Sequence, residues 1–249
     1  MSRVNFMGVP IDALNLDQTV DKVLHLIDNG ESFQHVCINP GKVIRMMEDP
    51  EVRQTIRRCE VISADGIGVV WMAKLLDVPI PERVAGIDLM DRLLGACAFR
   101  GYKPFFLGAK PEVLEAAVKH YQIRFPKLKF AGWRDGYFSD QEAEGVANQI
   151  AKSGAHMLFV AISSPKKEQF LGRYRDRMQV PFCMGVGGSF DVKAGKVKRA
   201  PKWMQRVGLE WSYRFLQEPK RMLRRNAVDT PKFLALALAA KLTGLEIPD

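Results

Sequence analysis

Short runs of apolar residues alternate with longer amphipathic stretches over most of the chain. The apolar runs predict buried strands at residues 4–7, 35–38, 60–63, 104–107, 128–131, 157–161 and 182–186. The stretches between them predict helices at residues 88–99, 111–125, 139–153 and 166–178. This alternation predicts an α/β fold, with a Rossmann-like, mainly parallel sheet covered by helices on both faces.

The pattern changes after residue 195. Residues 201–217 predict a helix in which Trp203, Val207, Trp211 and Phe215 recur at a spacing of four, as in a stripe that packs on a core. Pro219 interrupts it, and residues 231–242 predict a further apolar helix. We therefore expect a Rossmann-like domain at residues 1–195 and a helical appendage at residues 196–249.

The net charge of +9 is concentrated in one segment. Residues 193–225 contain eleven Lys or Arg and two Glu, so the rest of the chain is balanced. Such a segment attracts anions, whether phosphates, nucleic acid or acidic lipid head groups, although a solvated surface is the simpler interpretation. No nucleic-acid-binding motif is present, and basic residues beside aromatic ones favour an anionic membrane surface over nucleic acid.

The cysteines indicate a reducing compartment. Cys37, Cys59, Cys97 and Cys183 form no close pair and no CxxC, so neither zinc nor a disulfide framework is expected. Residues 1–14 predict no signal peptide, and the apolar run 233–240 is too short to span a membrane. We expect a cytoplasmic protein.

Ligands of parallel α/β sheets bind beyond the carboxyl ends of the strands, so the loops there carry the candidate chemistry. Asp65 could accept a proton from a hydroxyl group, or it could simply cap a helix. Gly66 and Gly68 lack the third glycine of a dinucleotide fingerprint. Gly187 and Gly188 could present backbone N–H groups to a diphosphate, or they could only shape a turn.

Several cations could neutralise phosphate charge at these loops. They are Arg83, Lys166, Lys167 and Arg199, although each alone is more often a solvated surface residue. The chain contains no Asp-x-Asp pair, which many sugar transferases use to hold a metal on the donor diphosphate. We therefore expect no metal and no cofactor, with cations and backbone donors stabilising a leaving diphosphate instead.

Together these loops resemble the WecG/TagA/CpsF glycosyltransferase family. The resemblance rests on ordered motifs that cover nearly the whole chain: Asn39-Pro40, Ala64-Asp65-Gly66-Ile67-Gly68, Arg83 with Ala85-Gly86-Ile87-Asp88-Leu89, Leu107-Gly108, Ser164-Pro165-Lys166-Lys167-Glu168, Gly185-Val186-Gly187-Gly188-Ser189-Phe190-Asp191, Arg199-Ala200-Pro201-Lys202-Trp203, Gly208-Leu209-Glu210-Trp211, Arg214 and Glu218-Pro219.

The resemblance implies an inverting, metal-independent transferase. Such enzymes pass a sugar, often N-acetylmannosamine or its uronic acid, from UDP to an undecaprenyl-diphosphate-linked sugar during cell-surface polysaccharide synthesis. They work at the inner face of the cytoplasmic membrane. A homo-oligomer is compatible with the sequence.

The family's roles can be carried over residue by residue. The resemblance implies that Asp65 is the general base, with Asn39 and Arg83 as the other catalytic residues. It assigns donor and diphosphate binding to Gly66, Gly108, Lys166, Lys167, Glu168, Gly187 and Gly188. It assigns the lipid diphosphate to Arg214, Arg221 and Arg224. We expect Arg199 and Arg206, in the same basic segment, to face the lipid diphosphate or the membrane as well.

Two positions depart from the family pattern. Cys37 stands where the family often has threonine, and Lys167 stands where it often has glutamine. Both bear on the donor sugar. The alternatives are a nucleic-acid-binding protein that uses the basic C-terminus, and another nucleotide-dependent enzyme on a Rossmann-like sheet, such as an oxidoreductase.

Overall fold

The computed structural model describes residues 3–247. The side chains of Arg206, Lys220, Arg221, Arg224, Arg225 and Asn226 lie outside this description.

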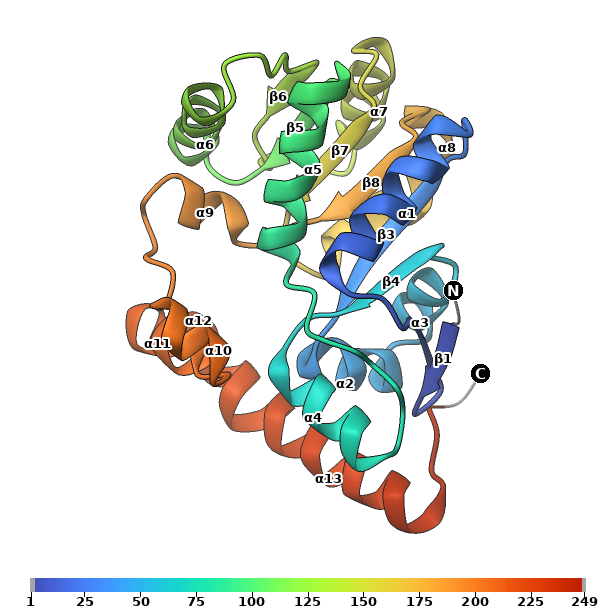
Figure 1. The fold of residues 1–249 in the computed structure, drawn as a ribbon. Coiled ribbons are helices and arrows are strands. Elements are labelled where there is room, and N and C mark those ends of the chain that lie inside the picture. The colour runs from blue at the N-terminus through green and yellow to red at the C-terminus, as the bar shows by residue number, and fades with distance from the viewer. Residues whose placement is uncertain (1–2, 248–249) are drawn as a thin grey trace.

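A six-stranded, fully parallel sheet forms the centre of the molecule (Figure 1). Its order is β4-β3-β8-β7-β5-β6, with strands β3 (Phe33–Ile38), β4 (Val61–Ala64), β5 (Pro104–Gly108), β6 (Gly132–Arg134), β7 (Met157–Ala161) and β8 (Phe182–Gly185). The predicted α/β fold with a parallel sheet is confirmed.

Helices cover both faces of this sheet. On one face, apolar residues of α1 (Leu16–Asp28), α5 (Gly86–Arg100), α6 (Pro111–Arg124) and α9 (Ser189–Lys193) form a single core cluster with the strands. On the other face lie α2 (Pro40–Glu48), α3 (Pro50–Arg57), α4 (Ile67–Leu75), α7 (Ala143–Lys152) and α8 (Lys166–Met178). Because the six strands are parallel, all their carboxyl ends lie at the same edge of the sheet.

The first predicted strand lies outside the main sheet. Residues Arg3–Phe6 (β1) pair antiparallel with Val9–Asp12 (β2) in a separate hairpin. Gly8 supplies the left-handed conformation of the turn, with φ of +82°. Asp12 ties the hairpin to the sheet, because its Oδ2 accepts the Ile62 N–H at 2.8 Å.

Two of the predicted elements begin several residues later in the structure than expected. The strand expected at residues 128–131 forms at Gly132–Arg134, because Leu128 turns into the core beside α6 instead of entering the sheet. The helix expected from residue 139 begins at Ala143, since the Glu142 carboxylate accepts the Ser139 N–H and forms a preceding turn.

The helix predicted at residues 201–217 is broken into α10 (Lys202–Arg206) and α11 (Glu210–Gln217). Gly208 lies between them with φ of +77°, a conformation that stops a right-handed helix. The expected core stripe is wrong: Trp203 is 62% exposed and Trp211 50%, and α11 has no buried residue. These aromatic side chains face outward instead of packing on the sheet.

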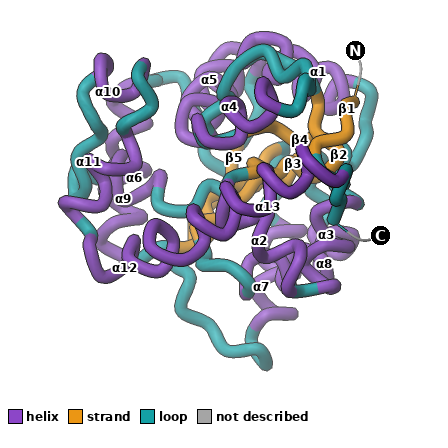
Figure 2. Tube along the Cα trace, turned by 90° about the horizontal axis from the view of Figure 1, so that it is seen from below, coloured by secondary structure: helices purple, strands orange, loops and turns teal. Residues whose placement is uncertain are grey.

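The last helices return the chain to the core. After α12 (Pro219–Arg224) and a π-helical turn (Arg225–Asp229), α13 (Thr230–Thr243) lies across α2 and α4, as Figure 2 shows from below. Phe233, Leu236 and Ala237 are buried in the same cluster as Ile38 of β3. The division at residue 195 stays a prediction. Within residues 3–247, no helix combines the length and the apolar character that crossing a bilayer requires.

Candidate functional site

The carboxyl ends of β3 and β4 bring Asn39 and Asp65 together. The Asn39 side chain caps α2 by accepting the Lys42 N–H at 3.0 Å, and the Asp65 N–H donates to the Ile38 carbonyl at 2.7 Å. Both residues are partly exposed. Gly66 follows with φ of +122°, a backbone conformation that residues with a side chain rarely adopt.

The loop before α5 completes the surroundings of Asp65. The Val84 N–H donates to the Ala64 carbonyl at 2.8 Å, so this loop runs along the end of β4. The Gly86 N–H then faces Asp65 Oδ2 at 3.5 Å, a long contact. Arg83 precedes Val84 and so lies near the same strand end.

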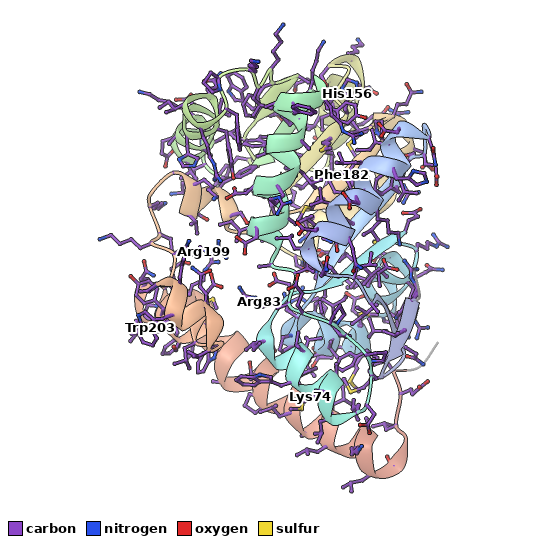
Figure 3. All side chains as sticks on the ribbon, in the orientation of Figure 1. Lys74, Arg83, His156, Phe182, Arg199 and Trp203 are labelled. Carbon is purple, nitrogen blue, oxygen red and sulfur yellow. The ribbon has the colours of Figure 1, made fainter. Side chains whose placement is uncertain are left out.

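Arg83 and Arg199 are joined by one carboxylate. Glu210 Oε2 accepts from Arg83 Nη2 at 2.9 Å, and Glu210 Oε1 accepts from Arg199 Nε at 3.1 Å. Arg199 also makes a bidentate pair with Asp88 at 2.5 and 2.7 Å. Burial lowers the pKa of Arg199, but Asp88 and then Glu210 outweigh it and raise that pKa overall. Figure 3 labels both arginines where the C-terminal helices approach the core.

A second charged group lies at the ends of β3, β7 and β8. Glu168 Oε1 pairs with Lys42 Nζ at 3.3 Å and with Lys167 Nζ at 3.2 Å. The Lys167 stem crosses Gly185, where any side chain would clash with it. The group thus holds two lysines and one carboxylate at the edge where ligands of such sheets bind.

Burial shapes the protonation of this group. Burial and the charge of Lys42 lower the pKa of Lys167, against the effect of Glu168. Burial raises the pKa of Glu168, but Lys42 and Lys167 outweigh it and bring the pKa to about 2. Glu168 is therefore ionised at neutral pH.

Cys37 lies beside Asp65 and Gly86. A side chain at Gly86 would meet Cys37 Sγ at 3.2 Å and Asp65 Oδ2 at 3.9 Å. Burial, followed by the Asp65 charge, raises the pKa of the Cys37 thiol to about 12, so it stays neutral at physiological pH. Ser63 Oγ donates to the thiol at 3.7 Å and contacts His35 Nε2 at 2.8 Å.

Other predicted donor-binding residues have distinct surroundings. Lys166 turns away from Lys167, donating to the Phe138 carbonyl at 2.5 Å and lying over that ring. It lines a groove of about 840 Å³ along α8 whose lining includes neither Asp65 nor Asn39. Gly108 packs against the β7 backbone, whereas Gly187 has open space on its side-chain side.

Most of the predicted lipid-binding arginines lie on the C-terminal helices. Arg214 Nε in α11 pairs at 3.2 Å with Glu218, the residue that follows the helix. Arg206 is in α10, and Arg221 and Arg224 are in α12, but their side chains lie outside the described residues. Their role stays a prediction.

Sequence reasoning missed three contributors: Lys42, Asp88 and Glu210. Each lies in a motif or a strand-end loop, but the sequence alone indicates no role for it. Its position could have indicated Lys42, which stands three residues after an asparagine at the end of a predicted strand. Pairs such as Arg83 with Glu210 are 127 residues apart, and no local pattern indicates them.

No group of three or more His, Cys, Asp or Glu that could hold a metal ion occurs among residues 3–247.

Comparison with known proteins gives one consistent family. The model described as "Glycosyl transferase WecG/TagA/CpsF family" matches residues 4–246. The chain is 35% identical over 232 residues to N-acetylglucosaminyldiphosphoundecaprenol N-acetyl-beta-D-mannosaminyltransferase of Bacillus subtilis (strain 168), covering 93% of this chain and 89% of that protein. It is 36% identical over 212 residues to the protein of the same name from Bacillus spizizenii (strain ATCC 23059 / NRRL B-14472 / W23), covering 85% and 81%.

Proposed function

Because the chain belongs to the WecG/TagA/CpsF family of glycosyltransferases, we propose that it moves a sugar from a UDP-sugar to an undecaprenyl-diphosphate-linked sugar. N-acetylmannosamine is the donor sugar that the names of the relatives favour, and their acceptor is N-acetylglucosaminyldiphosphoundecaprenol. N-acetylmannosaminuronic acid or a related hexose is the alternative donor. The product would enter cell-surface polysaccharide synthesis.

The position of Asp65 carries this proposal. Asp65 lies at the end of β4, next to the end of β3, and its carboxylate lies near Cys37. The loop that bears Arg83 runs along the same strand end. In the proposed single displacement, Asp65 accepts the proton of the acceptor hydroxyl. The freed oxygen attacks the anomeric carbon from the face opposite UDP, the bond to the diphosphate oxygen breaks, and the configuration inverts.

The leaving UDP carries the developing negative charge. Arg83 lies in the loop that runs along the end of β4, and Arg199 pairs with Asp88 in the first turn of α5. Both provide guanidinium donors that match phosphate oxygens. The backbone N–H groups of Gly187 and Gly188 are further donors, and the open side of Gly187 leaves room for a ligand. We propose that these groups stabilise the diphosphate without a metal.

The C-terminal helices would bring the enzyme to its lipid-linked acceptor. We propose that residues 196–249 act as an appendage of the catalytic domain at residues 1–195 and hold it on the inner face of the cytoplasmic membrane. Exposed Trp203 and Trp211 support this role, because tryptophan prefers the bilayer interface. The basic residues of the same segment suit anionic lipid.

The direct test measures UDP release by the purified protein. A panel of UDP-sugars is combined with a short-chain analogue of diphospholipid-linked N-acetylglucosamine, with and without EDTA. Acceptor-dependent release that survives EDTA is expected, and the donor that supports it names the transferred sugar. Release that requires added metal would contradict the assigned role of the arginines, and no release with any donor would contradict the proposal.

Replacement of Asp65 tests the mechanism. Asp65→Asn keeps the shape of the side chain but removes the proton acceptor, so kcat should fall roughly 100- to 10,000-fold. The matched control is Asp17→Asn, which changes an exposed carboxylate at the start of α1. Near-normal turnover by a folded Asp65→Asn protein would show that another group takes the proton.

A further inference from the structure

Glu210 holds the two arginines that the proposed function assigns to the leaving diphosphate. Its two carboxylate oxygens accept from Arg83 at 2.9 Å and from Arg199 at 3.1 Å. A carboxylate that bridges two guanidinium groups presents its oxygens much as a phosphate group does. The acidic side chain thus occupies donors that a nucleoside diphosphate needs.

Charge balance gives a second reason for competition. Arg83 and Arg199 carry two positive charges, and Glu210 and Asp88 carry two negative charges within hydrogen-bond distance of them. The cluster is therefore neutral as it stands. A diphosphate could gain attraction from both arginines only when one of the two carboxylates moves away.

The two carboxylates differ in how firmly they are held. Asp88 lies in the first turn of α5, a helix whose apolar face is packed in the core, and it orients Arg199 with two hydrogen bonds. Glu210 is the first residue of α11, a helix with no buried residue. Glu210 is therefore the partner that can leave, while Asp88 keeps Arg199 in place.

The position of Glu210 links this exchange to the C-terminal helices. Arg83 belongs to the loop beside Asp65, whereas Glu210 belongs to α11, so their ion pair joins the core to the appendage. Besides this pair, Gly208 packs closely on Ile67 at the start of α4. Loss of the Glu210 contacts would separate α11 from Arg83, while the Arg199–Asp88 pair would still join the start of the appendage to α5.

We propose that Glu210 is a latch that competes with the donor diphosphate for Arg83 and Arg199, so that donor binding releases α11 from the core. The latch rests on the proposed function, because it assumes a nucleoside diphosphate at these arginines. It makes Glu210 a positioning residue, whose effect on turnover comes through the arginines and the appendage. The order of events is then donor first, followed by movement of α10 and α11.

The test compares full-length variants for binding of UDP and of inorganic pyrophosphate by calorimetry. Glu210→Gln keeps the size of the side chain and removes its charge, so both ligands should bind roughly three- to tenfold more tightly. Glu144→Gln is the matched control, since Glu144 pairs with Arg177 far from the strand ends. It should bind both ligands as the wild type does.

Hydrogen exchange of the wild-type protein gives a readout that needs no variant. Saturating UDP should raise exchange of the backbone amides in residues 201–217, and Glu210→Gln should show the raised exchange without UDP. Unchanged or weaker UDP binding by Glu210→Gln, or lower exchange in the wild type with UDP, would overturn the latch alone. Failure of the wild type to bind either ligand would overturn the donor assignment in the proposed function, and the latch with it.

Discussion

His35 is a buried base whose protonation opposes folding. Burial lowers its pKa from 6.5 to about 3, and its Nδ1 has no hydrogen-bond partner among residues 3–247. Between these values the unfolded chain binds a proton that the folded protein does not bind. The free energy of unfolding should therefore decrease as the pH falls below 6.5, by on the order of 1 kcal/mol per pH unit.

Urea unfolding at about pH 7.5, 6 and 5 checks this expectation, in a range above the titration of Glu168. His35→Gln should flatten the dependence, because the glutamine takes up no proton. His25→Gln changes an exposed histidine at the end of α1 and should leave the slope in place. If the free energy of unfolding of His35→Gln decreased equally steeply as the pH falls, groups other than His35 would cause the acid sensitivity.

At this scale, sequence reasoning succeeded where topology decided the outcome. Asn39 and Asp65 meet because β3 and β4 pair in parallel and end at the same edge of the sheet. The strand pattern predicted that edge, and the family resemblance implied that Asn39 lies beside Asp65. Sequence reasoning missed the partners of the charges. Glu210 pairs with Arg83, 127 residues away, and Lys42 pairs with Glu168, 126 residues away. Such pairs depend on how the loops pack after folding.

At the scale of elements, the break between α10 and α11 sets where the appendage meets the core. Gly208 has φ of +77°, and a side chain there would lie 2.7 Å from Ile67 Cγ2. The periodicity of residues 201–217 predicted one continuous helix, because hydrophobic spacing does not report a single left-handed residue. The exposed tryptophans follow from the same break, since the stripe no longer lies on one helix face.

Alanine at Gly208 should therefore displace α10 and α11. Gly208→Ala and Gly195→Ala both place a side chain at positive φ, at a cost of about 1–2 kcal/mol each. Only Gly208→Ala also pushes on Ile67, because Gly195 has open space around it. Transferase activity should fall roughly 10- to 100-fold in Gly208→Ala and stay near normal in Gly195→Ala. Similar activities in the two variants would mean that contact with Ile67 does not position the appendage.

The last helix, α13, is packed into the hydrophobic core. Phe233 has no exposed surface and packs with Phe6 and the α2–α4 side of the sheet. Phe233→Ala should lower the free energy of unfolding by about 3–5 kcal/mol. Leu242→Ala, in the same helix but 84% exposed, should change it by less than about 0.5 kcal/mol. Equal, small effects in denaturant titrations would indicate that α13 is attached only loosely.

At the scale of the whole molecule, exposed apolar side chains gather on the helices that end the chain and on α4. Trp203 and Trp211 lie on α10 and α11, Leu238 on α13, and Trp71 on the neighbouring α4. Seen from below in Figure 2, α13 crosses the molecule with α4 on one side and α12 near its first turn. A surface of this kind, with basic residues in the same segment, suits the boundary between lipid head groups and acyl chains.

Binding to vesicles that contain acidic phospholipid tests this surface as a unit. The double variant Trp203→Ala/Trp211→Ala removes two interfacial aromatics whose side chains contribute little to the core, so it should stay folded and bind roughly tenfold more weakly. Trp133→Ala is the matched control, because Trp133 is also exposed but lies on the edge strand β6. It should bind vesicles as the wild type does. If the double variant and the control bind equally well, the aromatic residues of α10 and α11 do not contact the bilayer, and the basic side chains alone would have to account for attachment.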